Sequence, residues 1–287
     1  MPRCQELVAS QARYWDRKAP LRPPAELATL PSPRTAWTAG RWTLANWCRR
    51  HMAHAARSRR YRAGEARLAL VGDSILEQLE INASFANALD RLPAEWRRPL
   101  HLAIGGDQTQ HCLWRLRDGE LSASMAADAA LVYVVHVGTN NIGNYMGPGP
   151  THSPAETHDG VMGLVRYLLG AAKGRVLLTA ILPRTDAPRQ WLTGEWLCPA
   201  GGCDAPGPAA RPRTFARAID DANARIAASA VELAREHPRR LAYADCGRAV
   251  WARPELVPDG VHPGLDGMTA FFTCALHAMR RAGFLTQ

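Results

Sequence analysis

The amino-acid sequence predicts an α/β fold with a parallel sheet covered by helices on both faces. Short apolar segments alternate with segments of helical periodicity from residue 67 to residue 281, which is the pattern of strands joined by crossover helices. The segment LVYVVHV at 131–137 is apolar without alternation, as a central strand buried on both faces requires. With 47% hydrophobic and 21% charged residues, the composition is that of a globular protein.

The predicted elements follow one another in a regular order. A helix is expected at 40–60, where Leu44, Trp47 and His51 fall on one face at spacings of three and four residues. After it, the alternating pattern predicts strand 67–72, helix 75–90, strand 100–104, helix 109–117, strand 130–137, helix 155–170, strand 175–181, helix 213–236, strand 241–244 and helix 266–281.

Two segments interrupt this order. Residues 1–40 are rich in proline, alanine and arginine, and we expect them to form an extended arm ahead of a domain at 41–287. Residues 184–213 form a loop insertion of the length that is often functional in compact domains. Trp191 and Trp196 lie in this insertion and are weak candidates for substrate contact.

The net charge and the candidate targeting segments indicate which partners and which cellular location to expect. The net charge of +9 comes almost entirely from arginine, which indicates a compositional bias, and no nucleic-acid partner is expected. We read the arginine-rich run at 49–60 as the exposed face of a helix. No apolar run reaches the roughly 20 residues of a transmembrane helix, and the N-terminus lacks the apolar core of a secretory signal. We therefore expect a cytoplasmic location.

The number and spacing of the cysteines do not indicate a disulfide framework. Seven of them are scattered along the chain, an odd number without short regular spacing, so we expect no disulfide framework and no zinc site. Cys198 and Cys203 flank four residues of the insertion, and a local disulfide between them stays an open alternative.

The stretch LALVGDSILEQL at 68–79 reads as strand, tight turn and helix, with Ser74 at the turn. Such a serine is either a nucleophile at the carboxyl edge of the sheet or an ordinary helix cap. Three other loops belong to the same edge: Gly105-Gly106-Asp107, Gly138-Thr139-Asn140-Asn141, and the loop before the last helix, which carries Asp259 and His262.

These loops supply the parts that acyl transfer by serine needs. His262 can take the proton of the Ser74 hydroxyl, and Asp259 can hold the imidazole in the required tautomer. The backbone NH groups of Ser74 and Gly106, with the side-chain amide of Asn140, can form an oxyanion hole. Each motif alone is most often structural, but four in this order favour a hydrolytic site. The polar cluster His152, His158 and Asp159 reads as a solvated loop, so no metal and no other cofactor is implied.

The four motifs together resemble the signature blocks of the SGNH (GDSL-type) hydrolases. Within that superfamily, IGGDQTQHCLWRLRDGEL, VVHVGTNN and ILPR are similar to segments of the catalytic alpha subunits of intracellular platelet-activating-factor acetylhydrolase. The resemblance implies a flavodoxin-like three-layer sandwich with a five-stranded parallel sheet, metal-free ester hydrolysis by Ser74, Asp259 and His262, and an oxyanion hole that includes Gly106 and Asn140. It is also compatible with a homodimer. His136 replaces a tryptophan of the family pattern, and the block DGVHP is closer to carbohydrate-acting members.

The expected function is therefore a serine esterase that removes a short acyl group, acetyl above all, from a small-molecule, carbohydrate or lipid ester. One alternative keeps the site but transfers the acyl group to a sugar or lipid hydroxyl. A second alternative is a non-catalytic subunit that retains the fold and binds a partner through its basic surface or the tryptophans of its insertion.

Overall fold

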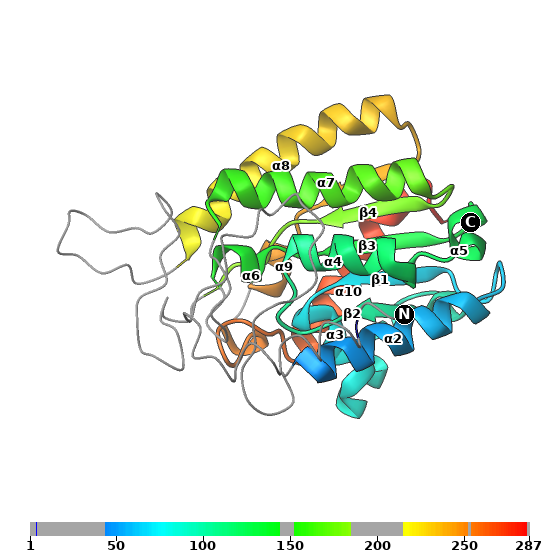
Figure 1. Ribbon diagram of the computed structural model, residues 1–287. Coiled ribbons are helices and arrows are strands. Elements are labelled where there is room, and N and C mark those ends of the chain that lie inside the picture. Colours follow the sequence, from blue (N-terminus) through cyan, green and yellow to red (C-terminus); the bar gives the residue numbers. More distant parts are fainter. Residues whose placement is uncertain (1–3, 5–43, 144–151, 185–214, 252–253, 286–287) are drawn as a thin grey trace, which may run out of the picture.

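A computed structural model of the 287-residue protein describes residues 4, 44–143, 152–184, 215–251 and 254–285. Its centre is a five-stranded, wholly parallel sheet in the order β2-β1-β3-β4-β5, which is the flavodoxin-like order (Figure 1). All five predicted strands are confirmed, with the bounds β1 Leu68–Gly72, β2 Leu100–Ala103, β3 Val132–His136, β4 Arg175–Thr179 and β5 Leu241–Ala244.

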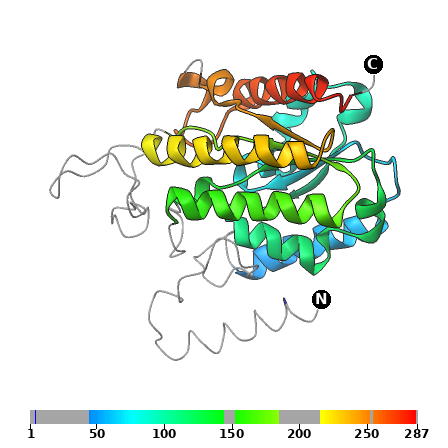
Figure 2. The same ribbon diagram turned by 90° about the horizontal axis from the view of Figure 1, so that it is seen from above.

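Helices cover both faces of this sheet, so the protein has three layers. Figure 2 shows α10 on one side of the sheet and α7 and α8 on the other. The α-helices are α2 Leu44–Arg60, α3 Ser74–Ile81, α4 Thr109–Arg115, α5 Ala123–Ala127, α6 Thr139–Ile142, α7 Pro154–Ala171, α8 Ala216–Glu236, α9 Gly247–Val250 and α10 Leu265–Arg281. Short 3-10 helices lie at Ala83–Leu89, Ala94–Trp96 and Pro254–Leu256, and a π-helical turn lies at Leu116–Glu120.

The two faces of the sheet carry separate apolar cores, because successive strand residues point to opposite sides. Val71 and Val135 pack with α4, α7 and α8, whereas Leu70 and Val134 pack with α3 and α10. These strand side chains are almost wholly buried, and each buried aliphatic side chain stabilises the fold by about 1.5–3 kcal/mol. The uninterrupted apolar strands of the sequence are thus explained by burial on both faces.

Two predicted helices end earlier than their periodicity indicates. The helix expected at 75–90 stops at Ile81, because the Asn82 side chain accepts a hydrogen bond from the Ser84 NH and starts a 3-10 helix. The helix expected at 109–117 ends as α4 at Arg115 and continues as a π-helical turn, in which Gly119 has a φ of +109°. That left-handed conformation is one that glycine adopts without strain.

The expectation that the cysteines form no disulfide framework is wrong. Disulfides join Cys4 to Cys48 and Cys246 to Cys274, whereas Cys112 is a buried free thiol. The bonded cysteines lie 44 and 28 residues apart in the chain, and folding brings them together at distances that local spacing does not reveal. Cys198 and Cys203 lie outside the described residues.

Among the described helices, none combines the length and the apolarity that crossing a bilayer requires.

Candidate active site

Ser74 stands at the carboxyl end of β1, where the chain turns sharply into α3. The turn needs glycine at position 72, because a Cβ there would lie 2.1 Å from the carbonyl oxygen of His136 on β3. Asp73 is the N-cap of α3, and its Oδ1 accepts a hydrogen bond from the Ile75 NH at 3.1 Å. Ser74 is therefore the first residue of the helix and not its cap, and its hydroxyl is available for other contacts.

The loop before α10 brings a histidine to this serine. His262 Nε2 lies 2.8 Å from Ser74 Oγ, and His262 Nδ1 lies 2.6 Å from Asp259 Oδ2. The other Asp259 oxygen accepts hydrogen bonds from the NH groups of Val261 and His262, at 2.8 and 2.6 Å. The three predicted catalytic residues thus form one continuous hydrogen-bonded chain, although Ser74 and His262 are 188 positions apart in the sequence.

The charge of Asp259 selects the tautomer of this histidine. Burial alone would raise the pKa of Asp259, but hydrogen bonds from the ring and the backbone NH of His262 outweigh it and lower the pKa to about 2. The carboxylate is therefore ionised at neutral pH and accepts the proton carried by His262 Nδ1. Nε2 then presents its lone pair to the hydroxyl of Ser74, as a general base must.

The second loop lies against the serine turn because β1 and β2 are neighbours. The Ile104 NH donates to the carbonyl of Gly72 at 3.1 Å, and the Asp107 NH closes a turn onto the carbonyl of Ile104 at 3.1 Å. Gly106 takes a φ of +78° inside this turn, a conformation that favours glycine. Within the described part of the chain, no protein group accepts a hydrogen bond from the Gly106 NH, so this NH is available to a ligand.

The third loop follows β3 and is hydrogen-bonded to the second. Asn140 Nδ2 donates to the carbonyl of Asp107 at 3.0 Å, and Gln108 Nε2 donates to the carbonyl of Asn140 at 2.7 Å. The Thr109 NH donates to Asn141 Oδ1 at 3.0 Å, which adds a further link between the two loops. The amide of Asn140 and the NH of Gly106 thus belong to one connected structure, as a preformed oxyanion hole requires.

A buried arginine that the sequence reading did not single out supports the third loop. Arg184 Nη1 donates to the carbonyls of Thr139 and Gly143, at 3.0 and 2.8 Å, and so holds both ends of α6. Its guanidinium carbon also lies 4.3 Å from the centroid of the Phe215 ring. In the sequence, Arg184 is the last residue of the segment ILPR, which carries part of the family resemblance, but its role as a buried support could not be inferred there.

His136, which stands where the resembling family has tryptophan, is fully buried and hydrogen-bonded. Its Nδ1 lies 2.8 Å from Thr179 Oγ1, and burial lowers its pKa to about 4. Trp191 and Trp196, the weak candidates for substrate contact, lie outside the described residues.

A second serine, histidine and aspartate set lies on the surface between α7 and α8. His158 Nε2 lies 2.8 Å from Ser229 Oγ, and His158 Nδ1 lies 2.8 Å from Asp159 Oδ1. Ser229 is in the middle of α8, where backbone NH groups are bonded within the helix and cannot bind an oxyanion. Among the residues that the structure describes, no three potential ligands are placed to hold a metal ion.

Fold and site together define a flavodoxin-like α/β protein of the SGNH type, with a serine, histidine and aspartate chain at the carboxyl edge of its sheet. Residues 70–270 match the GDSL-like lipase/acylhydrolase family, and the chain belongs to this family.

Curated relatives of this chain match it over only part of their length. The platelet-activating factor acetylhydrolase IB subunit alpha2 of Gallus gallus is 34% identical over 119 residues, which are 41% of this chain and 44% of the relative. The subunit alpha1 of Homo sapiens is 30% identical over 125 residues, which are 43% and 47% of the two chains. The matched part of the chain therefore spans less than half the length of these relatives.

Solved structures agree with the fold. A GDSL-like lipase from Bacteroides thetaiotaomicron superposes with a TM-score of 0.56 at 18% identity, over 82% of this chain and 97% of the other. A member of the lipolytic G-D-S-L family from Veillonella parvula gives a TM-score of 0.51 at 14% identity, over 75% and 98%. At these identities the likeness shows a common fold.

Proposed function

We propose that this protein is a serine esterase that hydrolyses short-chain carboxylic esters, with acetyl as the acyl group, through an acyl-enzyme on Ser74. The observation that carries the proposal is the hydrogen-bonded chain from Ser74 Oγ through His262 to Asp259. Membership of an acylhydrolase family supports ester hydrolysis, and the acetylhydrolase relatives support the choice of acetyl.

In the first half-reaction, His262 Nε2 takes the hydroxyl proton as Ser74 Oγ attacks the ester carbonyl carbon. The carbonyl oxygen becomes an oxyanion, which the NH groups of Ser74 and Gly106 and the Asn140 amide stabilise. The bond to the alcohol then breaks, and His262 returns the proton to the leaving oxygen. The alcohol departs and Ser74 carries the acyl group.

In the second half-reaction, water enters the position that the alcohol has left. His262 removes a proton from this water, whose oxygen attacks the acyl carbon, and the same donors bind the second oxyanion. The proton then passes to Ser74 Oγ as the acid departs. Asp259 stays ionised in both halves, because its pKa is about 2, and it stabilises the imidazolium that forms twice.

The experiment is hydrolysis of p-nitrophenyl esters from acetyl to decanoyl by three proteins: wild type, Ser74→Ala and Ser229→Ala. Ser229 is the matched control, because it forms the same kind of hydrogen bond to a histidine but lies inside a helix. We expect Ser74→Ala to lose at least a thousandfold in kcat and Ser229→Ala to match the wild type. A fluorophosphonate probe should label the wild type and Ser229→Ala, and spare Ser74→Ala.

The remaining outcomes identify the alternatives. Release of p-nitrophenol that speeds up with an added alcohol, together with formation of the new ester, would identify an acyltransferase. A folded wild type that neither hydrolyses any ester nor reacts with the probe would contradict the proposal and favour a binding subunit. Turnover that persists in Ser74→Ala would exclude Ser74 as nucleophile.

A further inference from the structure

The loop that carries Gly106 is fixed from behind by a buried carboxylate. Asp107 follows Gly106 directly, its side chain is fully buried, and both of its oxygens accept hydrogen bonds. Trp47 Nε1 donates to Oδ1 at 2.7 Å, and Arg115 Nε donates to Oδ2 at 2.7 Å. A buried carboxylate is stable only with such partners, so the two donors fix where the side chain of Asp107 lies.

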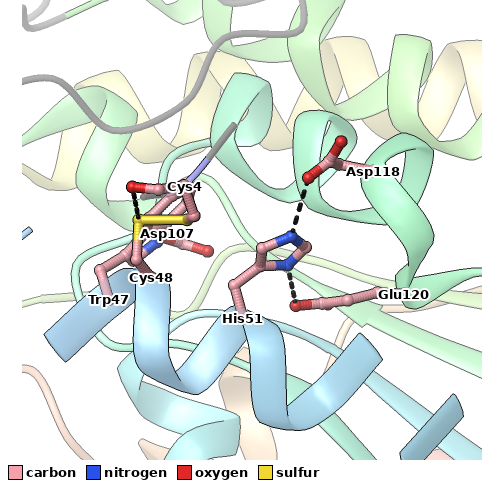
Figure 3. The surroundings of a disulfide bond; sticks show 7 residues. All are labelled: Cys4, Trp47, Cys48, His51, Asp107, Asp118 and Glu120. Carbon is pink, nitrogen blue, oxygen red and sulfur yellow. Dashed lines mark hydrogen bonds and ion pairs between the residues drawn. A yellow bond between two sulfur atoms is a disulfide. The ribbon is translucent and has the colours of Figure 1, made fainter. Parts of the chain in front are cut away.

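The two donors are themselves immobile. Arg115 is 1% exposed; it also donates to the carbonyl of Leu102 on β2 at 3.0 Å and pairs with the buried Glu120. Glu120 in turn lies 2.9 Å from His51 Nδ1. Figure 3 shows His51 on α2 between Asp118 and Glu120, with Trp47 on the same helix beside the disulfide of Cys4 and Cys48.

The ring of Trp47 cannot turn away from Asp107, because aromatic rings surround it. The centroid of its ring lies 5.6 Å from that of Trp114 and 6.0 Å from that of His51, and the side chain is 1% exposed. The direction of its single NH is therefore set by packing. A donor held in this way costs little conformational entropy when it binds the carboxylate.

The backbone around Asp107 is connected to two groups of the proposed oxyanion hole, the Asn140 amide and the Gly106 NH. The carbonyl of Asp107 accepts the hydrogen bond from Asn140 Nδ2, which aims the amide, and the peptide before Asp107 joins it to Gly106. On the other side of Gly106, the NH of Gly105 donates to the carboxyl group of Glu77, which pairs with Arg50 at 2.9 Å. Both neighbours of Gly106 are thus anchored through α2, α3 and α4.

We infer that Trp47 and Arg115 are positioning residues that act through Asp107 to hold the Gly106 NH and the Asn140 amide on the developing oxyanion. Neither residue is hydrogen-bonded to Ser74, Asp259 or His262; they act on the hole through Asp107, and Arg115 Nη2 also donates a long hydrogen bond of 3.5 Å to the carbonyl of Gly72 in the serine turn. Displacement of catalytic groups by about 1 Å can cost a hundredfold in rate. This inference builds on the proposed esterase function and adds residues that a search for the catalytic chain does not find.

The test compares Trp47→Phe with Trp114→Phe in the full chain. Both changes remove one buried indole from the same aromatic cluster, but only the first removes a donor to Asp107. We expect Trp47→Phe to lower kcat for p-nitrophenyl acetate by tenfold to a hundredfold with KM within twofold of wild type. Trp114→Phe keeps an aromatic ring against Trp47 and every donor to Asp107, so it should change kcat by less than threefold, at a comparable melting temperature.

A second variant tests the inference even where Trp47→Phe does not fold. Replacement of Trp47 by β-(3-benzothienyl)alanine keeps the shape of the ring and removes the NH alone, and the same loss in kcat is expected. Affinity for a boronic acid that forms a tetrahedral adduct on Ser74 should fall in parallel with kcat. An oxygen of this adduct occupies the oxyanion hole as the oxyanion of the transition state does, whereas the ground-state substrate interacts with the hole more weakly.

The outcomes separate this inference from the proposed function. An active wild type whose Trp47 variants keep kcat and boronate affinity would overturn the inference and leave the esterase standing. Equal losses in the variants of Trp47 and Trp114 would reduce both residues to structural roles and overturn it as well. A wild type without esterase activity would overturn both proposals.

Discussion

Asp73, next to the candidate nucleophile, makes the stability of the protein depend on pH. Its side chain is fully buried, Oδ1 accepts one backbone hydrogen bond, and Oδ2 has no hydrogen-bond partner among the described residues. Burial raises the pKa of Asp73 from an ordinary value of 3.8 to about 7, against the smaller opposing effects of the Ile75 NH and His262. The carboxyl group therefore keeps its proton in the folded protein to near-neutral pH.

The sign of the effect follows from comparing the two states. Below pH 4 both the folded and the unfolded chain carry the proton, and the group has no effect on the free energy of unfolding. Between pH 4 and 7 only the unfolded chain releases the proton, so folding stability falls by about 1.4 kcal/mol per pH unit. From 3.8 to about 7 the total loss is about 4 kcal/mol, a large part of a typical stability of about 5–15 kcal/mol.

Asp73→Asn should remove this dependence. Asparagine keeps the oxygen that caps α3 and cannot ionise. Urea unfolding followed by tryptophan fluorescence at pH 3, 6 and 8 should give equal stabilities at the lowest pH and a variant more stable by up to about 4 kcal/mol at the highest. A difference between variant and wild type that does not change with pH would refute the reasoning.

Asp128→Asn is the matched control of opposite sign. The Asp128 carboxylate accepts hydrogen bonds from the hydroxyl of Tyr61 and the NH groups of Gly64 and Ala130. Burial alone would raise the pKa of Asp128, but these hydrogen bonds outweigh burial and lower it. The contribution of the ionised Asp128 to the free energy of unfolding is present above pH 4 and disappears as the pH falls through the lowered pKa. Asp128→Asn should therefore be less stable than wild type at pH 8 and closer to it in acid.

Three further changes test the site and its frame. Asp259→Asn should lower kcat for p-nitrophenyl acetate about a hundredfold or more with little change in KM, because the amide no longer secures the tautomer of the base; a loss below tenfold would count against that role. Replacing both Cys246 and Cys274 by serine should lower the free energy of unfolding by about 3.5 kcal/mol, from a closed loop of 28 residues, as measured in urea without reductant. Gly72→Ala should lower it by more than about 2 kcal/mol, since the new Cβ meets a backbone carbonyl, whereas Gly170→Ala, with open space around it, should not destabilise the protein.

Local sequence patterns were sufficient for the sheet and for bringing Ser74, His262 and Asp259 into one hydrogen-bonded chain. Each strand is a short apolar run, and Ser74 follows one of them at a turn that needs glycine at position 72. Asp259 and His262 are three residues apart, so their mutual hydrogen bond is a local event. The parallel topology then brings the loops to one edge of the sheet, and this step follows from general rules of α/β folds.

Contacts between distant segments could not be predicted in this way. Trp47 and Asp107 are 60 residues apart, and nothing in the periodicity of either segment indicates that the indole meets the carboxylate. The same holds for Arg184, whose partners precede it by more than 40 residues. The early end of the helix expected at 75–90 has a different cause, since Asn82 competes with the helix through its own side chain.

The disulfide of Cys246 and Cys274 encloses the part of the chain that supplies Asp259 and His262. While the bond is intact, local unfolding of this segment leaves Asp259 and His262 tethered within a short covalent ring, and their return to Ser74 is an intramolecular search. Disulfides persist in oxidising surroundings and are reduced in most cytosols. In a reducing medium the same segment is held by its noncovalent contacts alone, so the fraction of molecules in which Ser74, His262 and Asp259 are hydrogen-bonded together becomes a function of the ambient thiol potential.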